Sequence, residues 1–531
     1  MATAHGDAHS VTAACKLGGG GSHRFLLRFL SLFAGFSAWL AYPAWAAKWE
    51  FVPTVTLTEG YTDNVSLSAD AVKQHQWITQ VTPAISIDAL GARGRFQVNY
   101  APAITYYGLG QTDGSERRDI QVYQRLNATG YAELLKKTLF VDAGATVDQY
   151  NISLLGPITI SNINTTGNVA TAKSTYVSPY ILREFGSAVR AEARFTYSLW
   201  ESDSTAALSD SVSNRVFLRL TSGPAYKLLT WDLSYSKEAI DYADETVLDP
   251  TSEVSSATAR RLITPTLGLL ASAGYENYTN TFGPGSNGPS WAVGFDWAPT
   301  ARTRLIATGG ERFYGDVYTL DFKHRTRLTA WGVTLSQNIT TTRSLFFIPG
   351  VTSTADYLDT LFTSQYPDPA ARKKAVEEFI DQTGLPPGLN GPTNAYVNQL
   401  FVNKNLTASV GILGVRNVLL AFAFDQTNEG LVGNTVISDA PLANRQTGAS
   451  FVWNWRITAR NAWNLSGSYT RNQTPSIGQI YNAAVVSMGL SRQFQPRLSG
   501  SLSYRRQQGE ANVAVTDYTE NAVFATLRIR F

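Results

Sequence analysis

Cysteine, charged residues and long apolar runs are all scarce in this sequence of 531 residues. Its single cysteine, Cys15, lies in an N-terminal segment that we expect to be removed, so we expect neither a disulfide nor a catalytic thiolate in the mature chain. Charged residues make up 16 % of the chain, against about a quarter in an average soluble domain. The formal charge of +3 lacks the strong basic excess of nucleic-acid-binding proteins, so we expect no nucleic-acid partner.

Glycine (42 residues) and aromatic residues (12 %) are abundant instead, and no linker-like change in composition divides the chain. The mean hydropathy of −0.12 argues against a protein with many transmembrane helices. After Ala47 no apolar run approaches the roughly 20 residues that a transmembrane helix needs.

The N-terminal region has the features of a secretory signal peptide. An apolar run, Phe25 to Leu40, begins among arginines and is followed by the small-residue site Ala44-Trp45-Ala46. We predict cleavage after Ala46, so that residues 1–46 are an N-terminal extension and signal peptide and residues 47–531 form the mature protein. An uncleaved anchor helix is the alternative.

The mature chain alternates apolar and polar residues with a period of two. In residues 291–297, Trp, Val, Phe and Trp alternate with Ala, Gly and Asp, which places one kind of side chain on each face of a strand. Two folds give this pattern: a soluble sandwich with its apolar face inward, and an outer-membrane barrel with its apolar face toward lipid. The same alternation recurs in 189–199, 229–235, 451–457 and 498–504.

Three features favour the barrel. The alternating segments run about ten residues, as tilted membrane-crossing strands do, aromatic residues lie near their ends, and short turns alternate with longer polar loops. We therefore predict an all-β fold: a closed antiparallel transmembrane β-barrel of roughly 22 strands (18–24) in the bacterial outer membrane, in contact with its lipid.

The C-terminal strand supports this prediction. Leu527, Ile529 and Phe531 face one way and alternate with Arg528 and Arg530. This ending resembles the C-terminal assembly signal of bacterial outer-membrane barrels, which implies the barrel-assembly machinery as a partner. A soluble edge strand that ends this way by chance is the alternative.

One helix is predicted in the otherwise β chain, over residues 368–383. Asp368 can cap it, Pro369 suits its first turn, and Gly384 can end it. It lies in the longest connection, residues 353–402, which strand parity places on the external side. The helix either packs on its own loop or folds into the lumen as a lid or plug.

No catalytic, cofactor or metal site is expected. The mature chain has two histidines, His75 and His324, neither with a recognisable catalytic partner, and no metal-ligand spacing, phosphate loop or nucleophile elbow is present. Parity slips near His324, which suggests a β-bulge. We expect a protein that is not an enzyme.

Arginine gives the predicted lumen its character, because 32 of the 44 basic residues are arginines. These arginines either tie neighbouring strands together through carboxylates or form a passage that favours anions. On the same face we expect fewer acids: Asp142, Asp148, Glu192, Asp232 and Asp296. The candidate lumen-lining residues are Arg95, Arg125, Arg190, Arg194, Arg215, Arg219, Arg304, Arg456, Arg528 and Arg530.

Finally, the mature N-terminus, KWEFVPTVTLTEGYTDNVSLS from Lys48, resembles the opening of a family of outer-membrane barrels associated with PEP-CTERM/exosortase systems. Further resemblance lies in PTARTRL from Pro299, HRTRLTAW from His324 and DPAARKKAVEEFIDQTGLP from Asp368. It implies an outer-membrane location and a surface-polysaccharide or protein-sorting context, but no reaction. Two functions remain open: a channel or export component, with anionic polysaccharide as a candidate partner, and a non-conducting structural or assembly barrel that presents external loops.

Overall fold

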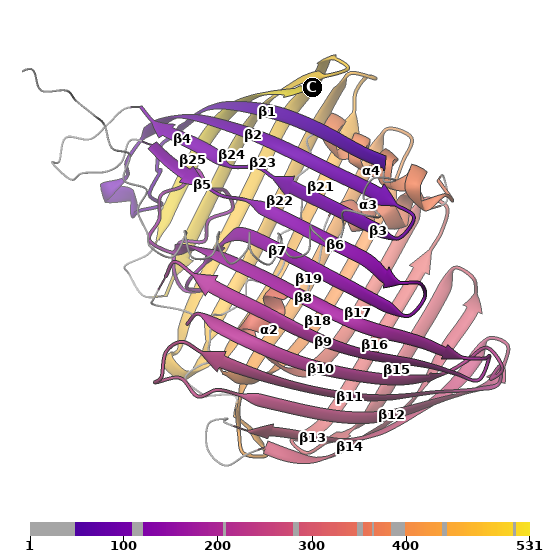
Figure 1. The fold of residues 1–531 in the computed structure, drawn as a ribbon. Helices are drawn as coiled ribbons and strands as arrows, with labels where there is room; N and C mark the ends of the chain where they lie inside the picture. The colour runs from indigo at the N-terminus through magenta and orange to yellow at the C-terminus, as the bar shows by residue number, and fades with distance from the viewer. Residues whose placement is uncertain are drawn as a thin grey trace, which may run out of the picture.

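A computed structural model describes residues 48–108, 120–204, 209–279, 286–347, 354–363, 366–383, 399–437, 443–512 and 517–531. The predicted signal peptide lies outside the described residues. A single antiparallel sheet winds into a barrel (Figure 1). It closes because β1 (Lys48–Thr62) pairs on one side with β2 (Gln76–Gly91) and on the other with β25 (Tyr518–Arg530).

The other strands follow one another around the barrel in chain order. They are β3 (Gly94–Tyr100), β4 (Ala103–Tyr107), β5 (Ile120–Tyr123), β6 (Leu126–Leu135), β7 (Leu139–Asn151), β8 (Val169–Phe185), β9 (Val189–Ser202), β10 (Ser211–Ser222), β11 (Leu229–Tyr242), β12 (Thr251–Thr264), β13 (Leu267–Thr279), β14 (Ser286–Thr300), β15 (Thr303–Arg312), β16 (Gly315–Arg325), β17 (Thr329–Thr341), β18 (Leu400–Leu413), β19 (Asn417–Val432), β20 (Thr435–Ile437), β21 (Asn444–Arg456), β22 (Asn461–Thr474), β23 (Gln479–Gln495) and β24 (Leu498–Ala511).

The described strands make a wall 22 strands around. β3 and β4 both pair with β2, so together they form one interrupted wall strand. β5 pairs with β4 and β6 pairs with β3, so β5 and β6 together form the next one. β20 pairs only with the end of β19 and lies outside the wall. The predicted closed antiparallel barrel of about 22 strands is confirmed.

Connections differ at the two ends of the barrel. At one end, here called the short-turn end, hairpins such as 186–188 and 301–302 join the strands; the other end is called the long-loop end. One local prediction was wrong. The arginine-rich stretch at His324 contains no bulge, because β16 ends at Arg325 and residues 326–328 form a turn before β17. The break in apolar–polar alternation near His324 therefore corresponds to the hairpin between β16 and β17.

Three α-helices occupy the described parts of the connection between β17 and β18. They are α2 (Thr342–Phe347), α3 (Thr354–Phe362) and α4 (Pro369–Thr383). α4 confirms the predicted helix, and Asp368 caps it by accepting a 2.8 Å hydrogen bond from the Ala371 N–H. α2 and α3 were not predicted. Among the described residues, no helix is long and apolar enough to cross a membrane.

The two faces of the wall differ in chemistry. On β14, Trp291 and Val293 point outward with about half of their surface exposed, whereas Asp296 points inward and is 3 % exposed. Large exposed apolar side chains recur around the outer face, for example Leu233, Leu269 and Leu490. The barrel thus has an apolar outer belt and a more polar lumen, as a membrane-spanning barrel requires.

Candidate functional site

Arginine–carboxylate pairs cross-link the inner wall. Asp296 on β14 accepts hydrogen bonds from Arg260 Nε (2.8 Å) on β12 and from Arg304 Nη2 (2.9 Å) on β15. One carboxylate therefore joins strands on both sides of its own. Because Asp296 is nearly fully buried, its charge depends on these two guanidinium groups for compensation.

The ten candidate arginines fall into different environments. Arg215 donates to Ser236 Oγ (3.0 Å), and Arg456 to the Val415 carbonyl (3.3 Å). Within the described chain, the guanidinium groups of Arg95 and Arg190 have no hydrogen-bond or ion-pair partner. Arg528 and Arg530 lie on β25, opposite Thr56 and Thr54 of β1. Four pair with acids: Arg125 with Asp148, Arg194 with Asp142, Arg219 with Asp232, and Arg304 with Asp296.

The inner wall carries more acid than the sequence indicated. Glu276 and Glu520 are both buried, and they bind Arg312 and Arg505. Both acids lie toward the long-loop end, outside the alternating segments from which the inward and outward faces of the strands were predicted. Much of the arginine charge is therefore neutralised inside the barrel.

α3 and α4, here called the helical insertion, pack against the inner wall. Leu358 of α3 is fully buried, and a Cβ placed on Gly411 of β18 would lie only 2.8 Å from Leu361 Cδ1. Most of the cluster is contributed by two neighbouring wall strands, β19 and β21, and by the two helices. Its buried members are Ala330, Leu358, Leu361, Phe362, Val376, Phe379, Leu413, Val418, Leu420, Phe422, Phe424 and Val452.

Polar contacts fix the insertion at the short-turn end. Arg372 Nε donates to Asp359 Oδ1 (2.8 Å), which joins α4 to α3. Lys373 Nζ lies 3.7 Å from Asp88 Oδ1, near the end of β2. α4 also contacts β22 and β23, so it connects separate sectors of the wall. Of the two sequence interpretations, the structure shows the helix against the inner wall rather than only on its own loop.

A second segment enters the lumen from the long-loop end: residues 152–168, here called the polar insertion, between β7 and β8. Arg505 on β24 holds it by donating to Ser161 Oγ (2.8 Å) and to Asn164 Oδ1 (3.1 Å). Glu520 accepts from Asn164 Nδ2 (2.8 Å), from Arg505 Nη2 (2.9 Å) and from Thr62 Oγ1 (2.7 Å). This network links the segment to β1, β24 and β25.

Two further contacts cross the same end. Arg343 of α2 is 1 % exposed and donates to Ser211 Oγ and to the Ser198 carbonyl, both at 2.9 Å. Asn434, in the turn between β19 and β20, donates to the Asn287 carbonyl of β14 at 3.0 Å. Connections from three parts of the chain thus reach across the long-loop end.

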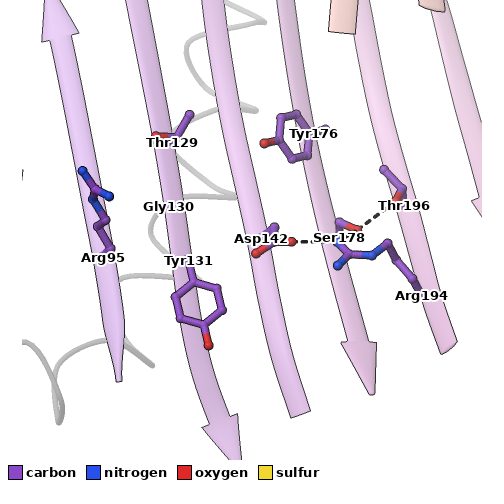
Figure 2. A pocket seen from close by; sticks show the side chains of 9 residues that line it. All are labelled: Arg95, Thr129, Gly130, Tyr131, Asp142, Tyr176, Ser178, Arg194 and Thr196. Atoms are coloured by element: carbon purple, nitrogen blue, oxygen red, sulfur yellow. Dashed lines mark hydrogen bonds and ion pairs between the residues drawn. The ribbon is translucent and has the colours of Figure 1, made fainter. Parts of the chain in front are cut away.

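A cavity of about 400 Å³ opens on the inner face of β3, β6, β7, β8 and β9 (Figure 2). Arg95 and Arg194 lie on its two sides, with Tyr131, Asp142 and Tyr176 between them. A larger cavity of about 770 Å³ lies between α3 and strands β14 to β19. Its basic residues are Arg302, Arg304, Lys323, His324 and Arg325, and no carboxylate lines it.

The histidines have structural surroundings. His75 lies 6.5 Å from the Tyr61 ring, and His324 Nδ1 is 2.8 Å from Thr303 Oγ1. No group of three or more potential metal ligands occurs among the described residues.

The residues of the predicted assembly signal lie on the outer face of the closing strand. Leu527 and Ile529 are each more than a third exposed, and the Phe531 N–H donates to the Pro53 carbonyl of β1 at 3.0 Å. Their role in assembly stays a prediction.

The wall residues beneath the helical insertion were not anticipated. β19 begins with Asn417-Val-Leu-Leu-Ala-Phe-Ala-Phe424, in which both faces are apolar. In a barrel whose lumen is mostly polar, a strand that is apolar on both faces indicates apolar packing on its inner side. Loss of alternation in 418–424 is the sequence feature from which this site could have been found.

The closed barrel, its apolar belt and its polar lumen define a class: the chain is an outer-membrane β-barrel. No protein-family model matches the sequence, and no curated protein sequence matches it either.

Several solved structures are similar in fold. They include the siderophore receptor PirA from Acinetobacter baumannii (8 % identity, TM-score 0.46, 91 % of this chain and 80 % of that one) and the ferric-catecholate import receptor Fiu from Escherichia coli (8 %, 0.46, 91 % and 82 %). A BenF-like porin from Pseudomonas fluorescens is also similar (8 %, 0.35, 91 % and 99 %). Similarity at this level indicates no ligand or partner.

Proposed function

We propose that the protein is a gated outer-membrane channel for an anionic surface polysaccharide, with the helical insertion as its gate. The observation that carries the proposal is the packing of α3 and α4 on the inner wall through one apolar cluster. Barrels of 16–18 strands enclose an aqueous channel, and 22-stranded transporters hold a plug in the lumen. A barrel of this size therefore has a lumen to occlude, and the insertion lies inside it.

The anionic cargo is supported by charge at the short-turn end. Arg302 and Arg325 line the larger cavity beside α3, and their side chains have no ion-pair partner in the described chain. Basic side chains in a pore favour anions. The resemblance to barrels of PEP-CTERM/exosortase systems supplies the surface-polysaccharide context.

A non-conducting structural barrel is the second candidate. It is favoured by the contacts that cross the long-loop end, notably those of Arg343 and Asn164. In this alternative the insertions are permanent fillings, and the external loops are the functional surface.

A reversible disulfide lock separates the two. Leu361→Cys with Gly411→Cys places two thiols where side chain and backbone already approach each other. Cys15 is absent after signal cleavage or is replaced by Ser. In planar bilayers we expect the oxidised protein to stay closed and the reduced protein to conduct intermittently. The single variant Leu361→Cys is the control, because it has no partner thiol.

Deletion of residues 354–383, replaced by a short Gly-Ser linker, gives the complementary result. We expect a persistently open channel with a preference for anions. If the correctly folded deletion variant conducts no ions, the channel is rejected in favour of the structural barrel. If oxidised and reduced double-cysteine proteins conduct equally, the helical insertion is not the gate.

A further inference from the structure

We propose that the cavity of Figure 2 is a binding site for an acidic saccharide unit inside the barrel. The proposal rests on the proposed function in taking the lumen as the passage for a polysaccharide, and it assigns a specific part of the wall to sugar recognition.

An aromatic ladder runs across the inner wall at this site. The rings of Tyr131 on β6 and Phe140 on β7 are stacked with centroids 6.0 Å apart, and those of Phe140 and Tyr180 on β8 are 5.1 Å apart. The Arg194 guanidinium of β9 lies 3.8 Å above the Tyr180 ring and closes the ladder. Four neighbouring strands thus present one continuous stacked surface.

The Tyr131 end of the ladder is the aromatic part that a ligand in the cavity can contact. Phe140 is 7 % exposed, whereas Tyr131 is 38 % exposed and faces the cavity. A sugar ring has an apolar face of C–H groups and a polar rim, and such a face packs well on an exposed aromatic ring. Because Phe140 packs on Tyr131 and Tyr180 packs on Phe140, the Tyr131 ring is ordered before a ligand arrives, which lowers the entropic cost of binding.

Polar groups line the cavity beside the exposed ring. Asp142 and Ser178 both bind Arg194, at 2.7 and 3.1 Å, and Ser178 Oγ is 2.8 Å from Thr196 Oγ1. These groups are fixed by one another, yet the carboxylate and hydroxyl oxygens retain acceptor capacity. They therefore offer a preorganised set of hydrogen-bonding partners beside an aromatic platform.

Arg95 gives the site its preference for an acid. Its guanidinium lines the cavity on the side opposite Arg194 and, within the described residues, has no carboxylate partner. Arg194, by contrast, already binds Asp142 and Glu192. A free guanidinium binds a carboxylate through two parallel hydrogen bonds, so the acidic group of a uronate would pair with Arg95 while its ring lies on Tyr131.

The site also adjoins the gate. Arg95 pairs with Leu90 on β2, two residues from Asp88, and Asp88 is the residue that Lys373 of α4 approaches. A chain seated on Arg95 and Tyr131 would therefore lie beside the point where the helical insertion meets the wall.

Calorimetric titration of the detergent-solubilised protein tests the site without requiring conductance. The probes are trigalacturonate, which is acidic, and maltotriose, which is neutral and of equal length. We expect the wild type to bind trigalacturonate more tightly. Arg95→Gln should weaken trigalacturonate binding about tenfold and leave maltotriose binding within about twofold, since a hydrogen bond to a charged group has that order of effect.

Variants at the ring separate stacking from a general loss of fold. Tyr131→Ala should abolish binding of both probes, whereas Tyr131→Phe, which keeps the ring, should retain most of it. Arg190→Gln is the matched control: within the described residues Arg190 is also an unpaired inner-wall arginine, but it does not line the cavity, so its replacement should change neither affinity. Heat-modifiability on gels confirms that each variant is folded.

Each outcome is decisive. Failure of the wild type to bind either probe, or equal binding by Tyr131→Ala and wild type, overturns the site. Equal loss of both probes in Arg95→Gln overturns the acidic preference. If the wild type binds trigalacturonate but the deletion variant does not conduct ions, the channel is rejected and the binding site stands. If the deletion variant conducts ions but the wild type binds neither probe, the binding site is rejected and the channel stands.

Discussion

The two insertions enter the same lumen but differ in how far polar contacts hold them. The helical insertion is fixed by an apolar cluster in which Leu358 and Leu420 are fully buried. The polar insertion also packs apolar side chains on the wall, Ile163 among them, but a buried ion pair, Arg505–Glu520, fixes it as well, and Asn164 and Thr62 use the remaining hydrogen-bonding capacity of that pair. The first type of contact is non-directional, and the second is directional and costly to leave incomplete.

This difference indicates which insertion can move. An apolar interface can separate and re-form in more than one arrangement, and its strength is proportional to the area in contact. A buried ion pair that loses one partner leaves an uncompensated charge in the wall, so displacement of residues 152–168 would strip the partners from Glu520. We therefore propose that the helical insertion is the gate and that the polar one has a fixed, structural role.

The largest expected effect comes from breaking the polar network. Glu520→Ala leaves Arg505 buried without its carboxylate, and removal of one partner of such a pair typically costs about 3–5 kcal/mol. We expect a matching fall in the free energy of unfolding in detergent, measured by denaturant titration, and faster proteolysis of the polar insertion.

A double replacement sharpens this result. Arg505→Met with Glu520→Leu removes both charges and should be less destabilising than Glu520→Ala alone. The control Glu510→Gln alters an exposed acid near the end of β24 and should change stability little. Equal costs for the single and double replacements would contradict the ion-pair explanation.

A comparable effect is expected at the apolar interface. Leu420→Ala deletes a fully buried side chain beneath α3 and α4, a change that costs about 2–5 kcal/mol in well-packed cores. The loss should weaken the contact between insertion and wall, so single-channel recordings should show a higher open probability.

The matched control is the neighbouring residue. Leu419→Ala alters the outer face of the same strand and removes no contact with the insertion, so gating should remain as in the wild type. If both variants raise the open probability equally, the inner-face contact is not what holds the insertion closed.

The barrel could be predicted because the alternation that indicates its strands lies between residues adjacent in the sequence. Alternation such as that of Trp291 and Val293 with Gly294 and Asp296 reports the two faces of a strand directly. The C-terminal strand and the helix at Pro369–Thr383 were likewise readable, because a terminal alternation and a capped amphipathic segment are local patterns too.

The insertions were harder to predict because they depend on contacts distant in sequence. Glu520 was not predicted on the inner face, and nothing near it or near Arg505 in the sequence shows that Asn164, more than 340 residues earlier, completes their network. The helix at Pro369–Thr383 was predicted, but its contact with the wall left a trace only on the partner strand, where residues 418–424 lack alternation. The cavity of Figure 2 draws on five strands, and no motif marks it.

The smallest expected effect concerns an exposed counterpart of the buried network. Asp70, in the short helix η1 (Asp70–Val72), accepts hydrogen bonds from Thr519, the neighbour of Glu520, and pairs with Lys73 at 3.0 Å. The hydrogen bond from Lys73, followed by that from Thr519, lowers the pKa of the Asp70 carboxyl below its ordinary value of 3.8. This pair lies at the surface, with the Asp70 side chain 64 % and the Lys73 side chain 25 % exposed, so salt screens it more than it screens the buried pair.

The direction of the pKa shift sets the pH window. Because the pKa is lower in the folded protein, the attachment of the β1–β2 loop to β25 is fully present above pH 3.8 and is lost as the pH falls through the lowered folded-state pKa. A spin label at Val72→Cys should therefore become more mobile on acidification below pH 3.8, and added salt should reduce the difference. In the Asp70→Asn background the label should be mobile throughout, with no step. A step of equal size in that background would show that a group other than Asp70 titrates. The charge of Asp70 would then not be what attaches the loop to β25.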